Sequence, residues 1–251
     1  IKSEQLYGIE LYRKVYALAC ANMLIHKDGK TNLQQLDAKS EEAGAWIKSI
    51  GITKVLMNPP YERKYGCMKI VQNVLDNVPK GTKAAFILPN TKLEKDNGLK
   101  LLKDHTLTHI IKLPSKTFVN VSVETSIFIF ETGTPHPKHL KIKAFNIEED
   151  GLETVKNQGR HDVNNLWQEI ENYWVEAISN GIDEKYGTLK LLDPKEGLSY
   201  PEPEVEVVLH FEDFMKTALD YQMFRQGIDE SVIKETFITQ LYSVETFEQG
   251  E

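Results

Sequence analysis

Four consecutive residues, Asn58, Pro59, Pro60 and Tyr61, have the side chains and spacing to do chemistry on an amine. An amine conjugated to a ring is a poor nucleophile, because its lone pair is delocalised into the ring. The Asn58 side-chain oxygen and a carbonyl of the rigid Pro-Pro segment can both accept its N–H bonds and direct that lone pair at an electrophile. The Tyr61 ring offers a flat face to a planar base turned out of its stack.

A short strand must hold these four residues. Residues 53–58 contain Val, Leu and Met and leave no polar face, which predicts a buried strand of an α/β sheet. Two prolines then remove backbone donors and prevent a helix, so the strand stops and the chain stays extended. We therefore expect Asn58 and Tyr61 at the carboxyl end of a parallel strand, where open α/β sheets bind ligands. The alternative is an Asn-Pro turn that only closes a strand.

An acidic residue upstream also follows a predicted strand. Residues 3–10 are predicted to form a strand that ends at Glu10, and residues 11–25 carry apolar side chains at helical spacing. A carboxylate at the tip of a strand and before a helix is where dinucleotide-binding folds hold ribose hydroxyls, so Glu10 is a candidate ligand-binding residue. The alternative is an acid favoured by the dipole of the helix that follows.

The rest of the first part reads as alternating helices and strands. A helical pattern over 67–78, a Gly-containing turn and an apolar run over 84–90 complete a βαβ unit with the preceding strand. The remaining predicted elements are a lysine-rich helix over 92–104, strands over 33–38, 107–113, 125–131 and 140–146, a loop over 115–124 that contains Phe118, and helices over 165–179, 211–226 and 230–241.

Composition and cysteine usage are those of an ordinary soluble protein of 251 residues, long enough to bury a sizeable core. No apolar run reaches membrane-spanning length, and no signal peptide is recognisable. Cys20 and Cys67 lack metal-ligand spacing, so we expect buried thiols, a cytoplasmic location and no metal site. His136 and His139 lie among prolines without a third ligand, which argues weakly for metal.

Charge is distributed unevenly within the net value of −7. Residues 1–139 contain 20 basic and 13 acidic residues, whereas residues 140–251 contain 10 and 24. A polyanion such as nucleic acid would therefore approach the first part. The alternative is that the charges only keep both parts soluble.

The Asn-Pro-Pro-Tyr stretch resembles the catalytic motif of S-adenosylmethionine-dependent amino-methyltransferases, in the form found in the adenine-N6 class. Its flanks resemble methylation subunits of type I restriction-modification systems over roughly residues 5–180. The matching flanks are Gly-Ile-Glu at 8–10, the helix ending Ala-Asn-Met-Leu-Ile-His at 21–26, Lys-Gly-Thr at 80–82, Phe-Ile-Leu-Pro at 86–89 and the aromatic segment near 165–179.

This resemblance implies a Rossmann-like α/β methyltransferase sheet, incomplete at its N-terminus, followed by a mainly helical, acidic C-terminal part. It implies a partial catalytic domain over 1–139 and a C-terminal extension over 140–251. The implied activity is methyl transfer from S-adenosylmethionine to the N6 amine of adenine in DNA. DNA and separate specificity and restriction subunits are the implied partners.

The resemblance also assigns roles to individual residues. Asn58 and the Pro59 carbonyl would hold the amine, while Tyr61 and Phe118 would stack on the two faces of the base. Glu10 would hold the cofactor ribose. In the family an aspartate after the next strand accepts the adenine amino group of the cofactor, and Asp37 matches it loosely, because Leu36 stands where a glycine often precedes it.

The family's glycine-rich loop, which meets the methionine part of the cofactor, has no match before Glu10. We therefore expect a piece of a longer polypeptide whose sheet lacks a central strand, which leaves backbone groups unpaired on both neighbouring strands. We expect weak or absent cofactor binding, and no activity, from this chain alone. The alternatives are a protein-glutamine or RNA amino-methyltransferase, or a non-catalytic methylase-like DNA-binding or scaffold subunit.

Overall fold

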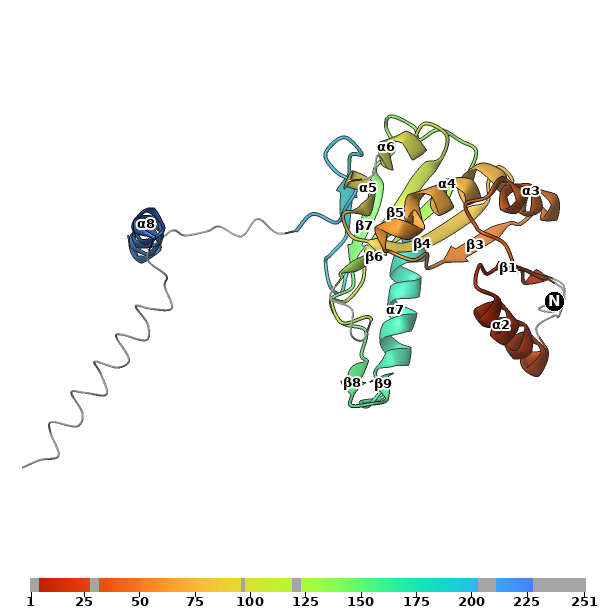
Figure 1. The fold of residues 1–251 in the computed structure, drawn as a ribbon, viewed down its shortest axis with the longest axis horizontal. Coiled ribbons are helices and arrows are strands. Elements are labelled where there is room, and N and C mark those ends of the chain that lie inside the picture. The colour runs from red at the N-terminus through yellow and green to blue at the C-terminus, as the bar shows by residue number, and fades with distance from the viewer. Residues whose placement is uncertain (1–4, 28–31, 96–97, 119–122, 203–210, 228–251) are drawn as a thin grey trace, which may run out of the picture. The chain divides into compact units, whose positions relative to one another are not determined.

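The computed structural model describes residues 5–27, 32–95, 98–118, 123–202 and 211–227 (Figure 1). The chain divides into two compact units, residues 1–201 and 202–251. In the second unit the structure describes helix α8 (Phe211–Gln226), as predicted, whereas the helix expected over 230–241 lies outside the described residues. No described helix has the length and apolar character needed to cross a membrane.

A mixed six-stranded sheet forms the centre of the first unit, with the strand order β10-β7-β5-β6-β4-β3. β3, β4, β5 and β7 run in the same direction, while β6 and β10 run against their neighbours. The predicted α/β fold is confirmed. The six strands are β3 (Lys54–Met57), β4 (Lys83–Pro89), β5 (Thr106–Lys112), β6 (Thr125–Glu131), β7 (Ile142–Asn146) and β10 (Lys190–Leu192).

The boundary expected at residue 139 falls inside this first unit. β7 begins three residues later and pairs with β5 along its length, from His109 opposite Lys143 to Lys112 opposite Asn146. Because backbone pairing joins β7 to the centre of the sheet, the two segments belong to one compact unit. The division between units comes after Pro201 instead.

One face of the sheet is covered by α3 (Glu41–Ile50) and α4 (Cys67–Asn77), as Figure 1 shows. Alternate residues of β4, including the fully buried Phe86, point into this core. α4 supplies Val71 and Val74 at helical spacing. Ser40 caps α3, because its hydroxyl accepts the Ala43 N–H at 3.1 Å.

The opposite face carries a smaller core against α7 (Trp167–Asn180). Trp174 and Ala177 of α7 pack with Ile111 and Phe145 of the sheet. This helix does not extend over β3, where the Leu56 side chain is 88% exposed. The expectation that β3 is buried was therefore wrong, because among the described residues β3 is the last strand of the sheet and is covered on one face only.

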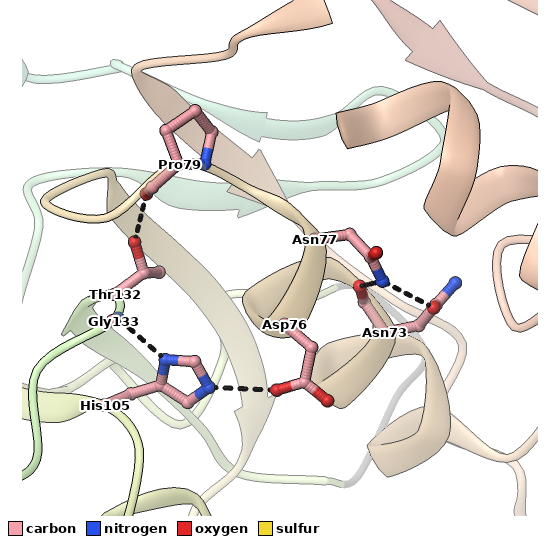
Figure 2. Close-up of polar contacts among 7 residues, drawn as sticks. All are labelled: Asn73, Asp76, Asn77, Pro79, His105, Thr132 and Gly133. Carbon is pink, nitrogen blue, oxygen red and sulfur yellow. Dashed lines mark hydrogen bonds and ion pairs between the residues drawn. The ribbon is translucent and has the colours of Figure 1, made fainter. Parts of the chain in front are cut away.

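A buried histidine, His105, links α4 to the turn that follows β6, as Figure 2 shows. His105 is 3% exposed; the Gly133 N–H donates to its Nδ1 at 3.2 Å, and its Nε2 lies 3.1 Å from Asp76 Oδ1. Because Nδ1 accepts a hydrogen bond, the ring carries its proton on Nε2 and donates it to Asp76. Thr132 next to Gly133 donates to the Pro79 carbonyl at 2.6 Å, so α4 and the turn after it are fixed to the ends of β5 and β6.

The N-terminal strands form a separate two-stranded parallel sheet, β1 (Gly8–Ile9) with β2 (Leu33–Gln34). Both strands are shorter than the predicted 3–10 and 33–38; residues 3 and 4 of the first lie outside the described part. Within the described residues, β3 pairs with β4 alone and β1 pairs with β2 alone.

The lysine-rich segment predicted as one helix over 92–104 contains two short helices, α5 (Lys92–Lys95) and α6 (Gly98–Leu101). Gly98 lies against the preceding turn, where an added Cβ would come within 2.5 Å of the Leu93 carbonyl oxygen. A side chain therefore does not fit at this position; residues 96 and 97, between the two helices, lie outside the described residues.

Candidate functional site

The carboxyl ends of the four parallel strands meet at one edge of the main sheet, which we call the carboxyl edge. The segments that follow the strands there begin at Asn58 after β3, Asn90 after β4, Leu113 after β5 and Ile147 after β7. Open α/β sheets bind ligands along this kind of edge, because polar loops converge there above the strands.

The Asn58–Tyr61 segment, at the end of β3, forms a constrained tip. The Tyr61 hydroxyl donates to Asn58 Oδ1 at 2.6 Å. Asn58 and Pro60 are exposed, Pro59 is buried and Tyr61 is half-buried. Two proline rings fix the backbone between the bonded side chains. The tip lies where the sequence predicted it, with the Asn58 amide held in one orientation and accessible to solvent.

The Tyr61 hydroxyl remains a donor at neutral pH. Burial is the main reason that the pKa of Tyr61 rises to about 12, and the nearby Cys67 thiol contributes as well. A carbonyl oxygen has two lone pairs, so Asn58 Oδ1 can accept a second hydrogen bond from an incoming amine while it keeps the Tyr61 bond.

The loop after the tip contacts the N-terminal helix. Lys64 pairs with Glu62 at 2.7 Å and lies 4.8 Å from the centre of the Tyr65 ring. A side-chain hydrogen bond between Tyr65 and Tyr12 raises the pKa of Tyr12 and lowers that of Tyr65. Because Tyr12 immediately precedes α2 (Arg13–His26), the start of α2 lies beside the loop that follows the Asn58–Tyr61 tip.

Glu10 occupies the predicted place, between β1 and α2, and is half-buried. Its Oε1 accepts the Tyr12 N–H at 2.9 Å, so the carboxylate also supports the start of α2, as the alternative interpretation proposed. Within the described residues its Oε2 makes no hydrogen bond. Glu10 therefore fits a role in holding a ribose hydroxyl, because one carboxylate oxygen is available as an acceptor.

Asp37 follows β2 and is engaged by Lys39. Its Oδ1 accepts the Lys39 N–H at 3.0 Å, and its Oδ2 lies 3.4 Å from the Lys39 ammonium. Asn73 of α4 fixes this loop by donating to the Ala38 and Ser40 carbonyls at 2.8 and 3.0 Å. A cofactor amine at Asp37 would have to compete with the lysine, so Asp37 fits the cofactor role less well than Glu10.

Phe118 lies in the loop after β5 and is half-buried. β5 is three strands away from β3, which corresponds to roughly 14 Å along the sheet. Residues 119–122, which follow Phe118, lie outside the described part of the chain. The structure places Phe118 and Tyr61 at the same edge but shows no contact between their rings, so their joint stacking on one base stays a prediction.

Four polar residues at the carboxyl edge were missed by the sequence analysis, and we call them the edge cluster: Asn90, Lys112, Glu124 and Ser126. Ser126 donates to Asn90 Oδ1 at 2.7 Å, and Asn90 Nδ2 donates to Glu124 Oε2 at 3.1 Å. Lys112 lies 3.6 Å from the same carboxylate oxygen. The sequence signal that could have identified the edge cluster is an asparagine directly after an apolar strand, a pattern that Asn90 shares with Asn58.

The described residues contain no group of three or more His, Cys, Asp or Glu side chains suited to a metal ion. Cys20 and Cys67 are free thiols, the first half-buried and the second buried. The arrangement at the carboxyl edge thus offers hydrogen-bond acceptors, aromatic rings and lysines.

A family model described as N-6 DNA Methylase matches residues 1–98 and 68–186 of the chain. The type II restriction enzyme and methyltransferase RM.BcgI of Heyndrickxia coagulans is 32% identical over 172 residues, which cover 63% of this chain. The chain spans only 27% of the length of that relative.

Solved structures of type I restriction-modification subunits share the fold. The methyltransferase subunit from Streptococcus thermophilus aligns with a TM-score of 0.57 and 20% identity, over 76% of this chain and 45% of that one. A modification subunit of a type I restriction enzyme from Vibrio vulnificus YJ016 aligns with a TM-score of 0.56 and 16% identity, over 78% and 45% of the two chains. At these identities the likeness concerns the fold.

Proposed function

The chain belongs to the N-6 DNA methylase family, and we propose that it contributes the amine-holding tip of an enzyme that methylates the N6 position of adenine in DNA within a restriction-modification system. The observation that carries this proposal is the Asn58–Tyr61 tip. A side-chain carbonyl oxygen is held by its hydrogen bond to Tyr61, lies open to solvent, and sits at the carboxyl end of a parallel strand.

The proposed chemistry needs positioning rather than a general base. Asn58 Oδ1 and the Pro59 carbonyl accept the two N–H bonds of the adenine amine, which draws the nitrogen from planar toward tetrahedral geometry and localises its lone pair. As the C–N bond forms and the S–C bond of the methyl donor would break, the nitrogen gains positive charge and its N–H groups become stronger donors. One N–H proton is afterwards released to solvent. Both acceptors therefore bind the transition state more tightly than the ground state.

S-adenosylmethionine, when bound, supplies the electrophilic methyl group on its sulfonium. Glu10 would hold its ribose through the available carboxylate oxygen, and Asp37 would approach its adenine amine once Lys39 is displaced. The Tyr61 ring supports one face of the substrate base, and we propose Phe118 for the other. Holding both reactants in line is the main contribution of this chain to the rate.

The proposed partners follow from the same family. DNA would approach residues 1–139, where basic residues outnumber acidic ones. Separate specificity and restriction subunits are proposed because the fold is that of type I methylation subunits. The free thiols Cys20 and Cys67 agree with a cytoplasmic location.

The test is product analysis with the intact protein. Plasmid DNA, RNA and a glutamine-containing peptide are incubated in parallel with the protein and S-adenosylmethionine, and each is digested and examined by mass spectrometry. We expect N6-methyldeoxyadenosine from DNA only. Methylated glutamine or RNA would support the other amino-methyltransferases, and the absence of any methylated product would support a non-catalytic subunit.

Two variants of the tip test the role of the acceptor. Asn58→Ala removes the side-chain oxygen and should abolish methylation while DNA binding stays unchanged. Asn58→Asp keeps an acceptor at the same place and should keep part of the rate. Methylation at the wild-type rate by Asn58→Ala would remove Asn58 from the mechanism.

A further inference from the structure

We propose that Asn90 is a positioning residue, whose side-chain amide fixes Glu124 and Ser126, at the end of the loop that carries Phe118, against the end of β4. The inference rests on the proposed function, because it concerns how the second aromatic side chain reaches the substrate base. Asn90 is assigned no contact with substrate or cofactor. It acts through the loop that it holds.

Asn90 bridges two residues at the end of that loop. Its Oδ1 accepts the Ser126 hydroxyl at 2.7 Å, and its Nδ2 donates to Glu124 Oε2 at 3.1 Å. Its backbone N–H also donates to the Glu124 carbonyl at 3.1 Å. Because Glu124 as a carboxylate can only accept, the amide nitrogen of Asn90 must face it, and the orientation of the amide is determined.

The beginning of the loop is tied to the same place. The Leu113 N–H donates to the Thr125 carbonyl at 2.9 Å, and Lys112 pairs with Glu124 at 3.6 Å. Both ends of the loop therefore converge on Glu124 and Thr125. Asn90 directly follows β4, and β4 pairs with β3, the strand that carries the Asn58–Tyr61 tip.

The anchor is buried on its Ser126 side, whereas the Glu124 side chain is 49% exposed. Ser126 is fully buried, and the Lys112 side chain is 13% exposed. Loss of the Asn90 side chain would leave the Ser126 hydroxyl buried without its acceptor, which favours a local rearrangement at the root of the loop. Because Lys112 pairs with Glu124, a shift of Glu124 also reaches the start of the segment 113–118, which carries Phe118.

The first experiment compares Asn90→Ala with Asn146→Ala in the intact protein. Asn146 is a matched control, because it follows the same pattern at the end of β7, where its Nδ2 donates to Glu148 Oε1 at 3.3 Å. Hydrogen exchange of residues 113–118 should become about tenfold faster in Asn90→Ala and stay unchanged in Asn146→Ala. Unchanged exchange in Asn90→Ala would overturn the proposal even without an activity measurement.

The second experiment is a double-mutant cycle with Phe118→Ala. Asn90→Ala should lower kcat/KM for DNA methylation roughly 10- to 100-fold, with the Kd for DNA and for S-adenosylmethionine unchanged. If Asn90 acts through the loop, the same change should cost less than about threefold once Phe118 is already alanine. Equal losses in both backgrounds would show that Asn90 acts by another route and overturn the proposal.

A rescue separates positioning from a general loss of folding. Asn90→Asp places two carboxylates together and should lose as much activity as Asn90→Ala. Adding Glu124→Gln restores the hydrogen bond with reversed polarity and should return the rate to within about threefold of wild type. If the double variant with Asn90→Asp and Glu124→Gln does not recover the methylation rate, the proposal for Asn90 is overturned. If the wild-type protein makes no N6-methyldeoxyadenosine, the proposed function is refuted instead.

Discussion

Removal of the Tyr61 hydroxyl alone separates two roles that one side chain combines at the Asn58–Tyr61 tip. Tyr61→Phe keeps the ring that we propose to face the base but deletes the 2.6 Å hydrogen bond that orients Asn58. Tyr61→Ala deletes both. The two variants therefore measure the orienting hydrogen bond and the ring separately.

The structure sets the expected magnitudes. A neutral hydrogen bond of this kind contributes about 0.5–1.5 kcal/mol, which corresponds to a roughly 2- to 13-fold lower kcat/KM in Tyr61→Phe. Stacking of a base on an aromatic ring adds about 1–3 kcal/mol, so Tyr61→Ala should lose a further roughly 5- to 150-fold. The pKa of Tyr61, raised to about 12, keeps the hydroxyl a donor, so its contribution should not change between pH 7 and 10.

The assay is steady-state methylation of plasmid DNA by the intact protein, with N6-methyldeoxyadenosine measured by mass spectrometry. Thermal unfolding of each variant serves as the control for folding. Equal activity in Tyr61→Phe and Tyr61→Ala would show that the ring contributes nothing beyond its hydroxyl. A wild-type rate in Tyr61→Phe would show that the Asn58 amide does not depend on Tyr61 for its orientation.

Three further predictions concern the scaffold of this site. His105→Ala should lower the free energy of unfolding by about 2–4 kcal/mol in urea titrations, because it opens a buried space and leaves the Gly133 N–H without its acceptor. Asp76→Asn keeps an acceptor oxygen for His105, so it should lower the free energy of unfolding by less than about 1 kcal/mol. Burial, together with two neighbouring lysines, lowers the pKa of His109 to about 4. As the pH falls from about 6.5 to 4, the unfolded chain therefore binds a proton that the folded chain does not, and the free energy of unfolding should fall over that range. His109→Phe should make this decline less steep. Leu56→Lys in this chain should change the free energy of unfolding by less than about 0.5 kcal/mol in urea titrations, because the Leu56 side chain is 88% exposed in the described part of the structure.

The position of the Asn58–Tyr61 tip could be predicted from local sequence signals. An apolar run that ends in two prolines can only be a strand that stops, and the helix and strand that follow it along the chain set the direction of β3. For the same reason Glu10 was found between a strand and a helix. The family resemblance added the assignment to amino-methylation, which the residue pattern alone left open between a catalytic motif and a simple turn.

Features that depend on long-range pairing were not predictable in the same way. The exposure of Leu56 follows from the position of β3 at the end of the sheet, and the separation of Phe118 from Tyr61 follows from the strand order. The edge cluster depends on the register that sets Leu88 and Lys112 opposite Ser126. Neither strand order nor register is encoded in a local pattern of side chains.

The most direct measurement of the central claim is a structure of the intact protein bound to DNA and to a non-reactive analogue of S-adenosylmethionine. We predict that an adenine turned out of the duplex lies against Tyr61, with its exocyclic nitrogen about 3 Å from both Asn58 Oδ1 and the Pro59 carbonyl oxygen. An extruded base bound elsewhere, or an exocyclic nitrogen that contacts neither acceptor, would contradict the account.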